Sequence, residues 1–286
     1  MTLAVCIVHW NTAGDLKTCL QALRSFPWKG GETEILVVDN GSTDGAPELV
    51  RAEFPEVVLL ANPTNRCFAE ATNQAVKASR GAYLLLLNPD ARVTDGALDA
   101  LIGFLQERPE VGVAAPRLVW PDGRVQASVR NHPTPGNVLT GRWTLPAREA
   151  TEPFRAPQPM ASCLLIRREV WEKVGPMDER FPLYFNDADW SLRAERAGVE
   201  TWCVPASSVV HDHAGTTSRV KTAALWESRR AWLRFNVKHF PRHPLRPLLD
   251  TLIVLDAWRR TGRWLQSLGK HGGETTPEDW ANAASS

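Results

Sequence analysis

Short apolar runs alternate with helical segments over the first hundred residues, and this alternation constrains the fold most. The runs have strand length and are apolar throughout, whereas the segments between them repeat apolar residues at helical spacing, as Leu16, Leu20 and Leu23 do. Strands that are apolar on both faces are typical of a parallel sheet covered by helices on each side. The predicted strands are 3–9, 34–39, 57–61 and 82–87, and the predicted helices are 15–26, 46–54, 68–79 and 94–106, the last with Thr94 as its N-cap.

The pattern changes after residue 110. A turn at Pro121-Asp122-Gly123 predicts a hairpin of strands 111–119 and 124–129. Residues 131–159 have no periodicity, and so long a loop inside a compact domain is usually functional. Beyond it we expect strands at 160–167, 201–204 and 207–211, and helices at 168–174, 187–197, 223–239 and 245–268.

Composition places the chain among ordinary globular proteins. Of 286 residues, 43% are hydrophobic and 23% charged, which excludes wholesale disorder. The five cysteines form no C-x-x-C pair, which excludes a zinc ribbon, and the apolar neighbours of Cys6, Cys163 and Cys203 indicate reduced core thiols. We find neither a signal peptide nor an apolar stretch long enough to span a membrane, and expect a cytoplasmic protein.

The net charge of +1 hides an asymmetry, because residues 216–270 alone carry a net charge of +9. Basic and apolar residues, including Trp226 and Trp232, mix over 223–268. Such a basic amphipathic segment could lie on a membrane surface, at the inner face, or pack on the rest of the protein with a solvated basic face. Nothing in the sequence resembles a nucleic-acid-binding module, so we expect no nucleic-acid partner.

Polar clusters follow three of the predicted strands, at 9–11 (His-Trp-Asn), 39–42 (Asp-Asn-Gly-Ser) and 88–90 (Asn-Pro-Asp). In open α/β sheets ligands bind at the carboxyl ends of the strands, so these clusters predict a ligand site. The alternative is that they are only turns and helix caps, since Asp, Asn, Gly and Ser all favour turns.

Seven segments, in this order, resemble family 2 glycosyltransferases, and specifically their bacterial rhamnosyltransferase-like branch. The resemblance spans about residues 3–218 and implies a GT-A fold: an α/β nucleotide-diphospho-sugar transferase domain with a mostly parallel central sheet flanked by helices. The C-terminal helical segment would extend it. The segments are VCIVHWN (5–11), ILVVDNGSTDG (35–45), NRCFAEATN (65–73), LNPD (87–90), ASCLLIRR (161–168), FPLYFNDADWSLR (181–193) and 205–218.

We therefore expect three parts. Residues 1–218 would form the catalytic domain, with a nucleotide-binding half at about 1–110 and an acceptor half at about 111–218. Residues 219–270 would form the basic amphipathic helical extension, and residues 271–286, which are small and polar, a flexible tail.

The resemblance also implies site residues. Asp90 ends the family's D-x-D-like motif, here with Asn88 first, and would bind a divalent metal, Mg²⁺ or Mn²⁺; the late histidine, His211, is a second candidate ligand. A metal neutralises the diphosphate that leaves as the donor's glycosidic bond breaks. Trp10, Asn11, Asp39, Asn65 and Asn88 would bind the donor, with Asp39 on the nucleoside and Trp10 and Asn11 lining the base pocket.

Asp187 is the candidate general base, since an inverting transfer needs a carboxylate to take the proton of the acceptor hydroxyl. The alternatives are that it only caps the helix that follows, or that Asp189 is the base. Two positions depart from the family's usual pattern: Asn186 replaces the first acid of E-D-x-D, and Cys67 replaces the glycine of N-x-G-F.

The predicted function is sugar transfer from a nucleoside diphosphate, UDP or dTDP, with rhamnose as an example, to a glycan or lipid-linked acceptor, for cell-surface polysaccharide or glycoconjugate synthesis. The lost acid at Asn186 leaves open a binding protein without turnover. A nucleotidyltransferase is the other alternative, although His9-Trp10-Asn11-Thr12 is not the Gly-rich phosphate loop it should carry.

Overall fold

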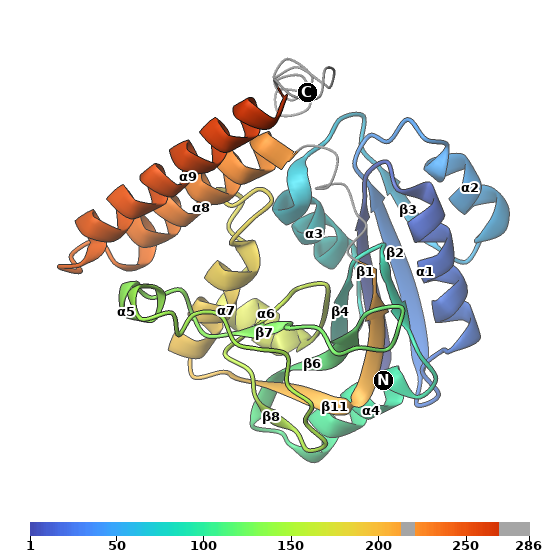
Figure 1. The fold of residues 1–286 in the computed structure, drawn as a ribbon. Coiled ribbons are helices and arrows are strands. Elements are labelled where there is room, and N and C mark those ends of the chain that lie inside the picture. The colour runs from blue at the N-terminus through green and yellow to red at the C-terminus, as the bar shows by residue number, and fades with distance from the viewer. Residues whose placement is uncertain (213–220, 269–286) are drawn as a thin grey trace.

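The computed structural model describes residues 1–212 and 221–268, with side chains in the second range described from 224 to 261. A central sheet is flanked by helices on both faces, and two long helices lie side by side at one end of the molecule (Figure 1). The predicted α/β class and the helical extension are confirmed. Within the described residues no helix is both long and apolar enough to cross a membrane.

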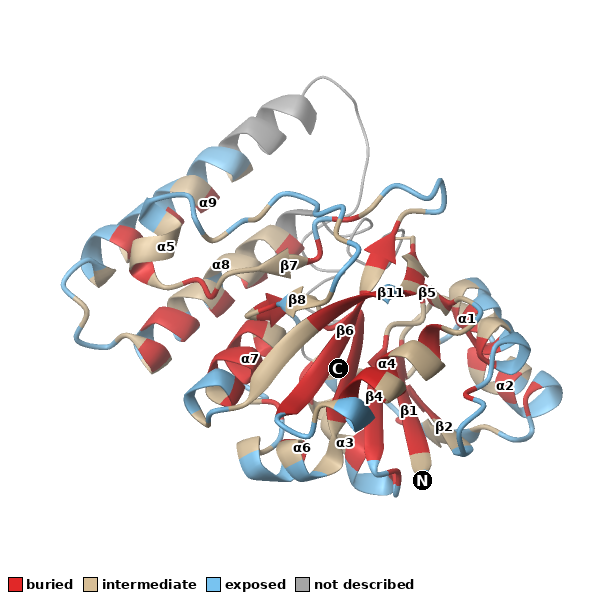
Figure 2. Ribbon diagram, turned by 90° about the horizontal axis from the view of Figure 1, so that it is seen from below, coloured by how far each residue is buried: buried red, intermediate tan, exposed pale blue. Residues whose placement is uncertain are grey.

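The first half of the sheet follows the prediction. Strands β1 (Thr2–His9), β2 (Glu32–Asp39), β3 (Val58–Ala61) and β4 (Tyr83–Leu87) are parallel and lie in the order β3-β2-β1-β4. All four therefore end at the same edge, where the polar clusters follow β1, β2 and β4. The inner strands β1 and β4 are buried along most of their length (Figure 2), whereas β3 at the edge of the sheet is partly exposed.

Alternate residues of each strand pack against the helices on opposite faces of the sheet. Leu3, Val5 and Ile7 of β1 pack toward the helices α1 (Ala13–Ser25), α2 (Ala46–Glu53) and α4 (Ala97–Glu107). Ala4, Cys6 and Val8 pack on the opposite face. That face is covered by α3 (Cys67–Ala78), α6 (Arg168–Val174) and α7 (Asn186–Arg196).

The second half of the sheet is mixed in direction. Strand β10 (Cys163–Arg167) runs antiparallel between β4 and β6 (Val111–Val119), and the last strand, β11 (Glu200–His211), lies parallel to β6 and antiparallel to β5 (Ala91–Val93). The predicted strands 201–204 and 207–211 are one strand, because a bulge between Val204 and Ser208 absorbs the interruption at Pro205.

Two further expectations were wrong. Thr94 is not the N-cap of α4: that position is Gly96, at φ 70°, and the Thr94 hydroxyl donates instead to the carbonyl of Ser208 on β11 (2.7 Å). The hairpin is also not formed as predicted, since 111–119 and 124–129 share one bridge, Val119 with Val125. The backbone after this bridge turns away from β6 and contributes to a separate two-stranded sheet.

The segment 131–159 is not one irregular loop. It contains the short helix α5 (Pro135–Leu139) and the strands β8 (Phe154–Arg155) and β9 (Gln158–Pro159). Strand β9 pairs with β7 (Val129–Arg130), and β8 pairs with β11. These pairings join segments that are distant in sequence, which a local pattern does not reveal.

The C-terminal helices α8 (Lys221–His239) and α9 (Arg246–Leu268) bear out the packing alternative for α8, whereas contact of the basic segment with a membrane remains a prediction. Helix α8 packs on α7, with Ala231 and Phe235 against Phe181, Ala188 and Leu192. Helix α9 lies on α8 and leaves large apolar side chains exposed on its outer face. The predicted tail, 271–286, lies outside the described residues.

The cysteine thiols are reduced, and Cys6, Cys19, Cys163 and Cys203 are buried, as expected for core thiols. Burial raises the pKa of Cys6 and of Cys203 to about 12, so neither is a thiolate at neutral pH.

Candidate active site

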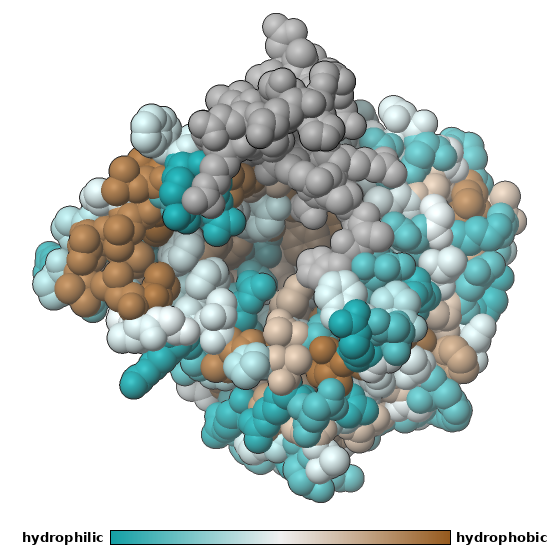
Figure 3. Space-filling view, in the orientation of Figure 1, coloured by the Kyte–Doolittle hydropathy of each residue, from teal (hydrophilic) through white to brown (hydrophobic). Residues whose placement is uncertain are grey.

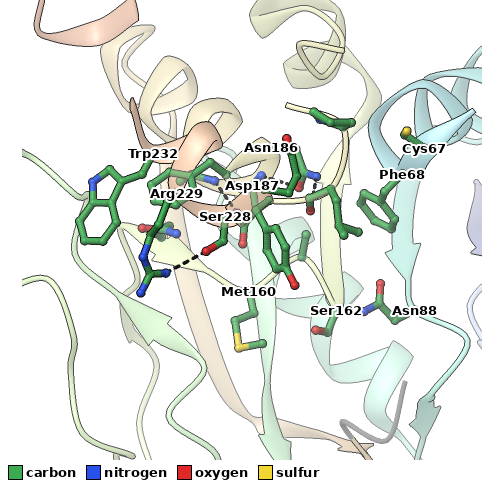
Figure 4. A pocket seen from close by; sticks show the side chains of 18 of the residues that line it. Cys67, Phe68, Asn88, Met160, Ser162, Asn186, Asp187, Ser228, Arg229 and Trp232 are labelled. Atoms are coloured by element: carbon green, nitrogen blue, oxygen red, sulfur yellow. Dashed lines mark hydrogen bonds between the residues drawn. The ribbon is translucent and has the colours of Figure 1, made fainter. Parts of the chain in front are cut away.

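A cavity of about 1230 Å³ lies between the carboxyl edge of the sheet and the helices α5, α7, α8 and α9. Asp187 lies in its middle, between Trp232 and Arg229 on one side and Asn88 and Ser162 on the other (Figure 4). Six predicted site residues line it: Trp10, Asn65, Asn88, Asp90, Asp187 and His211.

Asp90 and His211 form a buried pair on neighbouring strands. Asp90 directly precedes β5, and the register of β11 places His211 opposite Ala91. His211 Nε2 lies 3.4 Å from Asp90 Oδ1, and both side chains are almost fully buried at the floor of the cavity. The two residues proposed as metal ligands are therefore brought together.

Gln126 orients the His211 ring, and the sequence analysis missed it. Its Nε2 donates to the carbonyls of His211 (2.5 Å) and Val119 (3.3 Å), which fixes the amide because carbonyls only accept. Its Oε1 consequently faces His211 Nδ1 (3.1 Å), which must donate. In the neutral imidazole, Nε2 then carries the lone pair on the side of Asp90.

This donor set fits a divalent cation. A carboxylate oxygen and an imidazole nitrogen, both acceptors, face one region of the cavity floor, and Mn²⁺ in particular accepts both ligand types. No cluster of three or more His, Cys, Asp or Glu side chains able to hold a metal exists in the described part of the chain. The remaining coordination positions would fall to substrate oxygens and water, as is usual for Mg²⁺. Further polar candidates, at 213 and 216–218, lie outside the described residues.

Trp10, Asn65 and Asn88 line the same end of the cavity as the Asp90–His211 pair. The side-chain Oδ1 of Asn65 accepts from the backbone N–H of Cys67 (2.8 Å) and so holds the turn that starts α3. Cys67 has φ 64°, in the left-handed region that favours glycine. This explains why a glycine is usual at this position, and Cys67 adopts the required backbone despite its side chain.

Asn11 and Asp39 do not line the cavity. Asn11 Oδ1 accepts from the N–H of Thr43 (2.8 Å), and Asp39 Oδ2 accepts from the N–H of Ser42 (3.1 Å). Both side chains thus stabilise the turns after β1 and β2. Asp39 is only 2% exposed. Its direct contact with a nucleoside, and that of Asn11, remain predictions.

Asp187 lies in the first turn of α7, which begins one residue earlier than predicted, at Asn186. Burial raises the pKa of the Asp187 carboxyl, and the charge of Arg130 partly opposes this shift. A carboxylate with a raised pKa, open to a cavity, suits proton abstraction. Asp187 also accepts from the N–H of Ala188 (2.7 Å), so its carboxyl contacts the first turn of α7, and its role as the base remains a prediction.

Asp189 is occupied elsewhere. It is fully buried between α7 and α8, where it accepts from His239 Nε2 (2.7 Å) and Arg193 Nε (2.9 Å) and pairs with Lys238 Nζ (2.5 Å). Burial alone would raise the pKa of its carboxyl, but the hydrogen bonds from His239 and Lys238 lower it. Asp189 does not line the cavity, which leaves Asp187 as the candidate base.

Comparisons with known proteins agree with this geometry. Residues 4–175 match the sequence model of glycosyl transferase family 2. The chain belongs to this family. It is 32% identical over 213 residues to N-acetylglucosaminyl-diphospho-decaprenol L-rhamnosyltransferase of Mycobacterium tuberculosis, a match covering 65% of this chain and 68% of that protein. The resemblance to rhamnosyltransferases is thereby confirmed, and the chain is a family 2 glycosyltransferase.

Solved structures confirm the GT-A fold. The mannosyltransferase PcManGT of Pyrobaculum calidifontis, in complex with GDP-Man and Mn²⁺, superposes with a TM-score of 0.60 at 17% identity, over 99% of this chain and 79% of that one. TarS of S. aureus, residues 1–349 with UDP, gives 0.56 at 16% identity, over 82% and 66%.

Proposed function

We propose that this family 2 glycosyltransferase moves a sugar, with inversion, from a UDP or dTDP donor to a lipid-linked glycan acceptor used in cell-surface polysaccharide or glycoconjugate synthesis. One observation carries the proposal: a buried carboxylate–imidazole pair, Asp90–His211, and a carboxyl of raised pKa, Asp187, line the same cavity. The pair suits a divalent metal that binds the donor's diphosphate, and the carboxyl suits removal of the proton from an acceptor hydroxyl. The rhamnosyltransferase of Mycobacterium tuberculosis, whose name gives a diphospho-decaprenol acceptor, supports the lipid-linked class.

In this proposal Trp10, Asn65 and Asn88 bind the donor at the carboxyl edge of the sheet, while Asn11 and Asp39 hold the turns that shape this wall. Asp90 and His211 would hold the Mg²⁺ or Mn²⁺. The metal, when bound, supplies positive charge to the diphosphate as the bond to the sugar breaks.

Asp187 would take the proton of the acceptor hydroxyl. The hydroxyl oxygen bonds to the anomeric carbon from the face opposite the diphosphate, so the configuration inverts. Asp187 leaves the step protonated and the nucleoside diphosphate leaves with the electrons of the broken bond. A carboxyl held above its ordinary pKa matches this proton transfer better than an ordinary exposed aspartate.

We further propose that the protein works at the inner face of the membrane through the outer face of α9. Leu248, Leu255 and Trp258 are 53%, 54% and 74% exposed there, beside Arg259 and Arg260. Apolar side chains gather over α8 and α9 in the space-filling view (Figure 3). An apolar face next to arginines suits an anionic lipid surface.

The donor site is tested by thermal shift with UDP, dTDP, GDP and CDP, each with and without Mn²⁺. We expect a Mn²⁺-dependent shift with UDP or dTDP, followed by transfer of the matching sugar to a lipid-linked acceptor with inverted configuration by NMR. A nucleotide-dependent shift without transfer or donor hydrolysis would indicate a binding protein instead.

Membrane contact is tested separately by flotation with vesicles containing anionic phospholipid. Leu255→Glu should abolish flotation at low salt, whereas Val58→Glu, which changes a side chain of similar exposure on the edge strand β3, should not. Absence of flotation of the unchanged protein would overturn this part of the proposal.

A further inference from the structure

We propose that the end of the cavity between α5, α8 and α9 binds the prenyl chain of a polyprenyl-diphosphate acceptor, and that Arg130 binds the acceptor's diphosphate. This inference rests on the proposed function and deepens it, since it names the acceptor class and residues that would recognise it. Four observations on the described residues carry it: the size of the cavity, its apolar end, an exposed exit and the charge of Arg130.

The cavity is larger than a donor needs. At about 1230 Å³ it exceeds the roughly 300–1000 Å³ of ordinary small-molecule sites. The predicted donor and metal residues occupy only the end at the sheet edge. Beyond Asp187, the lining comes from α5, α8, α9 and Trp143, none of which holds a predicted donor or metal residue, so a second ligand has room on that side (Figure 4).

The end beyond Asp187 is apolar and aromatic. The rings of Trp143 and Trp232 lie 4.9 Å apart, and Phe185 stacks on Trp143 at 6.1 Å, all on the cavity wall. Apolar side chains from α5 and α9 complete this end: Val138, Leu139, Leu249, Leu252 and Ile253. A wall of this composition stabilises bound hydrocarbon by burying it.

This apolar end reaches the surface. Leu249 and Ile253 are buried, but Leu139 and Leu252 line the cavity while 37% and 44% exposed. The exposed apolar face of α9 continues from Leu252. A prenyl chain much longer than the cavity could therefore pass between α5 and α9 and remain in contact with apolar surface, or with lipid.

Arg130 distinguishes a diphosphate-linked chain from a plain lipid. The other arginines at this end are paired with acids: Arg229 and Arg260 with Asp256, and Arg234 with Glu227. Among the described residues Arg130 has no carboxylate within ion-pair distance, and its guanidinium lies over the Trp143 ring at 5.7 Å. Its charge also acts on the Asp187 carboxyl. An anion bound there would be close to the base, as a diphosphate attached to the acceptor sugar must be.

The test uses calorimetry with the full chain and geranylgeranyl diphosphate below its critical micelle concentration, compared with inorganic pyrophosphate and geranylgeraniol. We expect the diphosphate lipid to bind at least tenfold more tightly than either fragment. Leu252→Glu should weaken this binding at least tenfold. Its matched control, Val254→Glu, changes a residue of the same helix that is equally exposed but does not line the cavity, and should bind like the unchanged protein.

Arg130→Ala should weaken geranylgeranyl diphosphate about tenfold and leave geranylgeraniol unaffected, with Arg130→Lys recovering part of the loss. Affinity for UDP or dTDP with Mn²⁺ should not change in any of these variants. Equal weakening by Leu252→Glu and Val254→Glu, or binding no tighter than pyrophosphate, would overturn the inference. Nucleotide binding and donor hydrolysis are measured on the same samples. If the unchanged protein shows neither, the proposed function is refuted instead.

Discussion

His211 Nε2 lies 3.4 Å from Asp90 Oδ1, although His211 ends β11 and Asp90 follows β4, far earlier in the sequence. The antiparallel register of β11 on β5 brings them together, and the N–H of Asp212 donates to the carbonyl of Asp90 (3.1 Å). The candidate metal pair therefore depends on strand pairing between distant segments, and its geometry depends on whatever orients the His211 ring.

Gln126 provides that orientation, and Gln126→Leu should weaken Mn²⁺ binding about 10–100-fold, the usual effect of losing the partner of a histidine ligand. The leucine cannot accept from His211 Nδ1, so the ring loses its fixed tautomer. The measurement is a Mn²⁺ titration of thermal stability with the nucleotide present. Gln21→Leu, on the exposed side of α1, is the control. Equal Mn²⁺ affinity in both variants would show that Gln126 does not act through His211.

Asp187→Asn should reduce turnover by a factor of about 10²–10⁴, the usual contribution of a general base. Nucleotide affinity should stay within a factor of about two, because the amide has the same shape and Asp187 lies beyond the donor end. Steady-state transfer and nucleotide calorimetry measure the two effects. The control is Asp95→Asn at an exposed position. Retained turnover would leave Asp187 as a cap of α7 and assign the base to another group.

The pH dependence of kcat should show a limb that rises with pH, because only the ionised Asp187 accepts a proton. Burial raises the pKa of this carboxyl, so the limb should lie above the pKa of about 3.9 of an ordinary aspartate. Arg130→Met removes a charge that favours the ionised form, and should move the limb to still higher pH. An unmoved limb, measured at saturating acceptor, would contradict this interaction between Arg130 and Asp187.

The part of the fold that could be predicted depends on the local pattern of apolar and polar residues. The strands before residue 90 are apolar on both faces, and their polar ends necessarily meet at one edge. Gln126 and Arg130 could not be identified because their roles depend on contacts made across the chain: Gln126 with β11, and β7 with β9. The predicted strand 124–129 gave no indication of the contact between Gln126 and the end of β11, and Arg130 follows that strand.

Turn chemistry limited the site prediction in another way. Asn11 and Asp39 satisfy backbone N–H groups, which is also the ordinary reason for such residues at strand ends. The same residue types therefore suit both a ligand site and a turn. In the structure Asn88 and Asp90 line the cavity, whereas Asn11 and Asp39 do not. The aromatic end of the cavity could not be foreseen, because Trp143 and Trp232 meet only when α8 packs on α7.

Asp189 of α7 pairs with Lys238 and His239 of α8, and the removal of its charge gives the last prediction. Asp189→Asn leaves Lys238 and His239 without the buried carboxylate they face, and should lower the free energy of unfolding by about 3–5 kcal/mol, as breaking a buried ion pair does. Asp122→Asn, which removes an exposed partner of Arg124, should leave the free energy of unfolding nearly unchanged, because solvent screens an exposed ion pair.

Urea unfolding at several pH values separates the charge from mere packing. The pKa of Asp189 is lowered in the folded protein, so its stabilisation is present above the unfolded pKa of about 3.9 and is lost as the pH falls through the folded value. The Asp189→Asn variant should therefore approach the stability of the unchanged protein as the solution is acidified. A difference that stays constant with pH would mean that Asp189 stabilises the helices by shape and hydrogen bonding alone, and not by its charge.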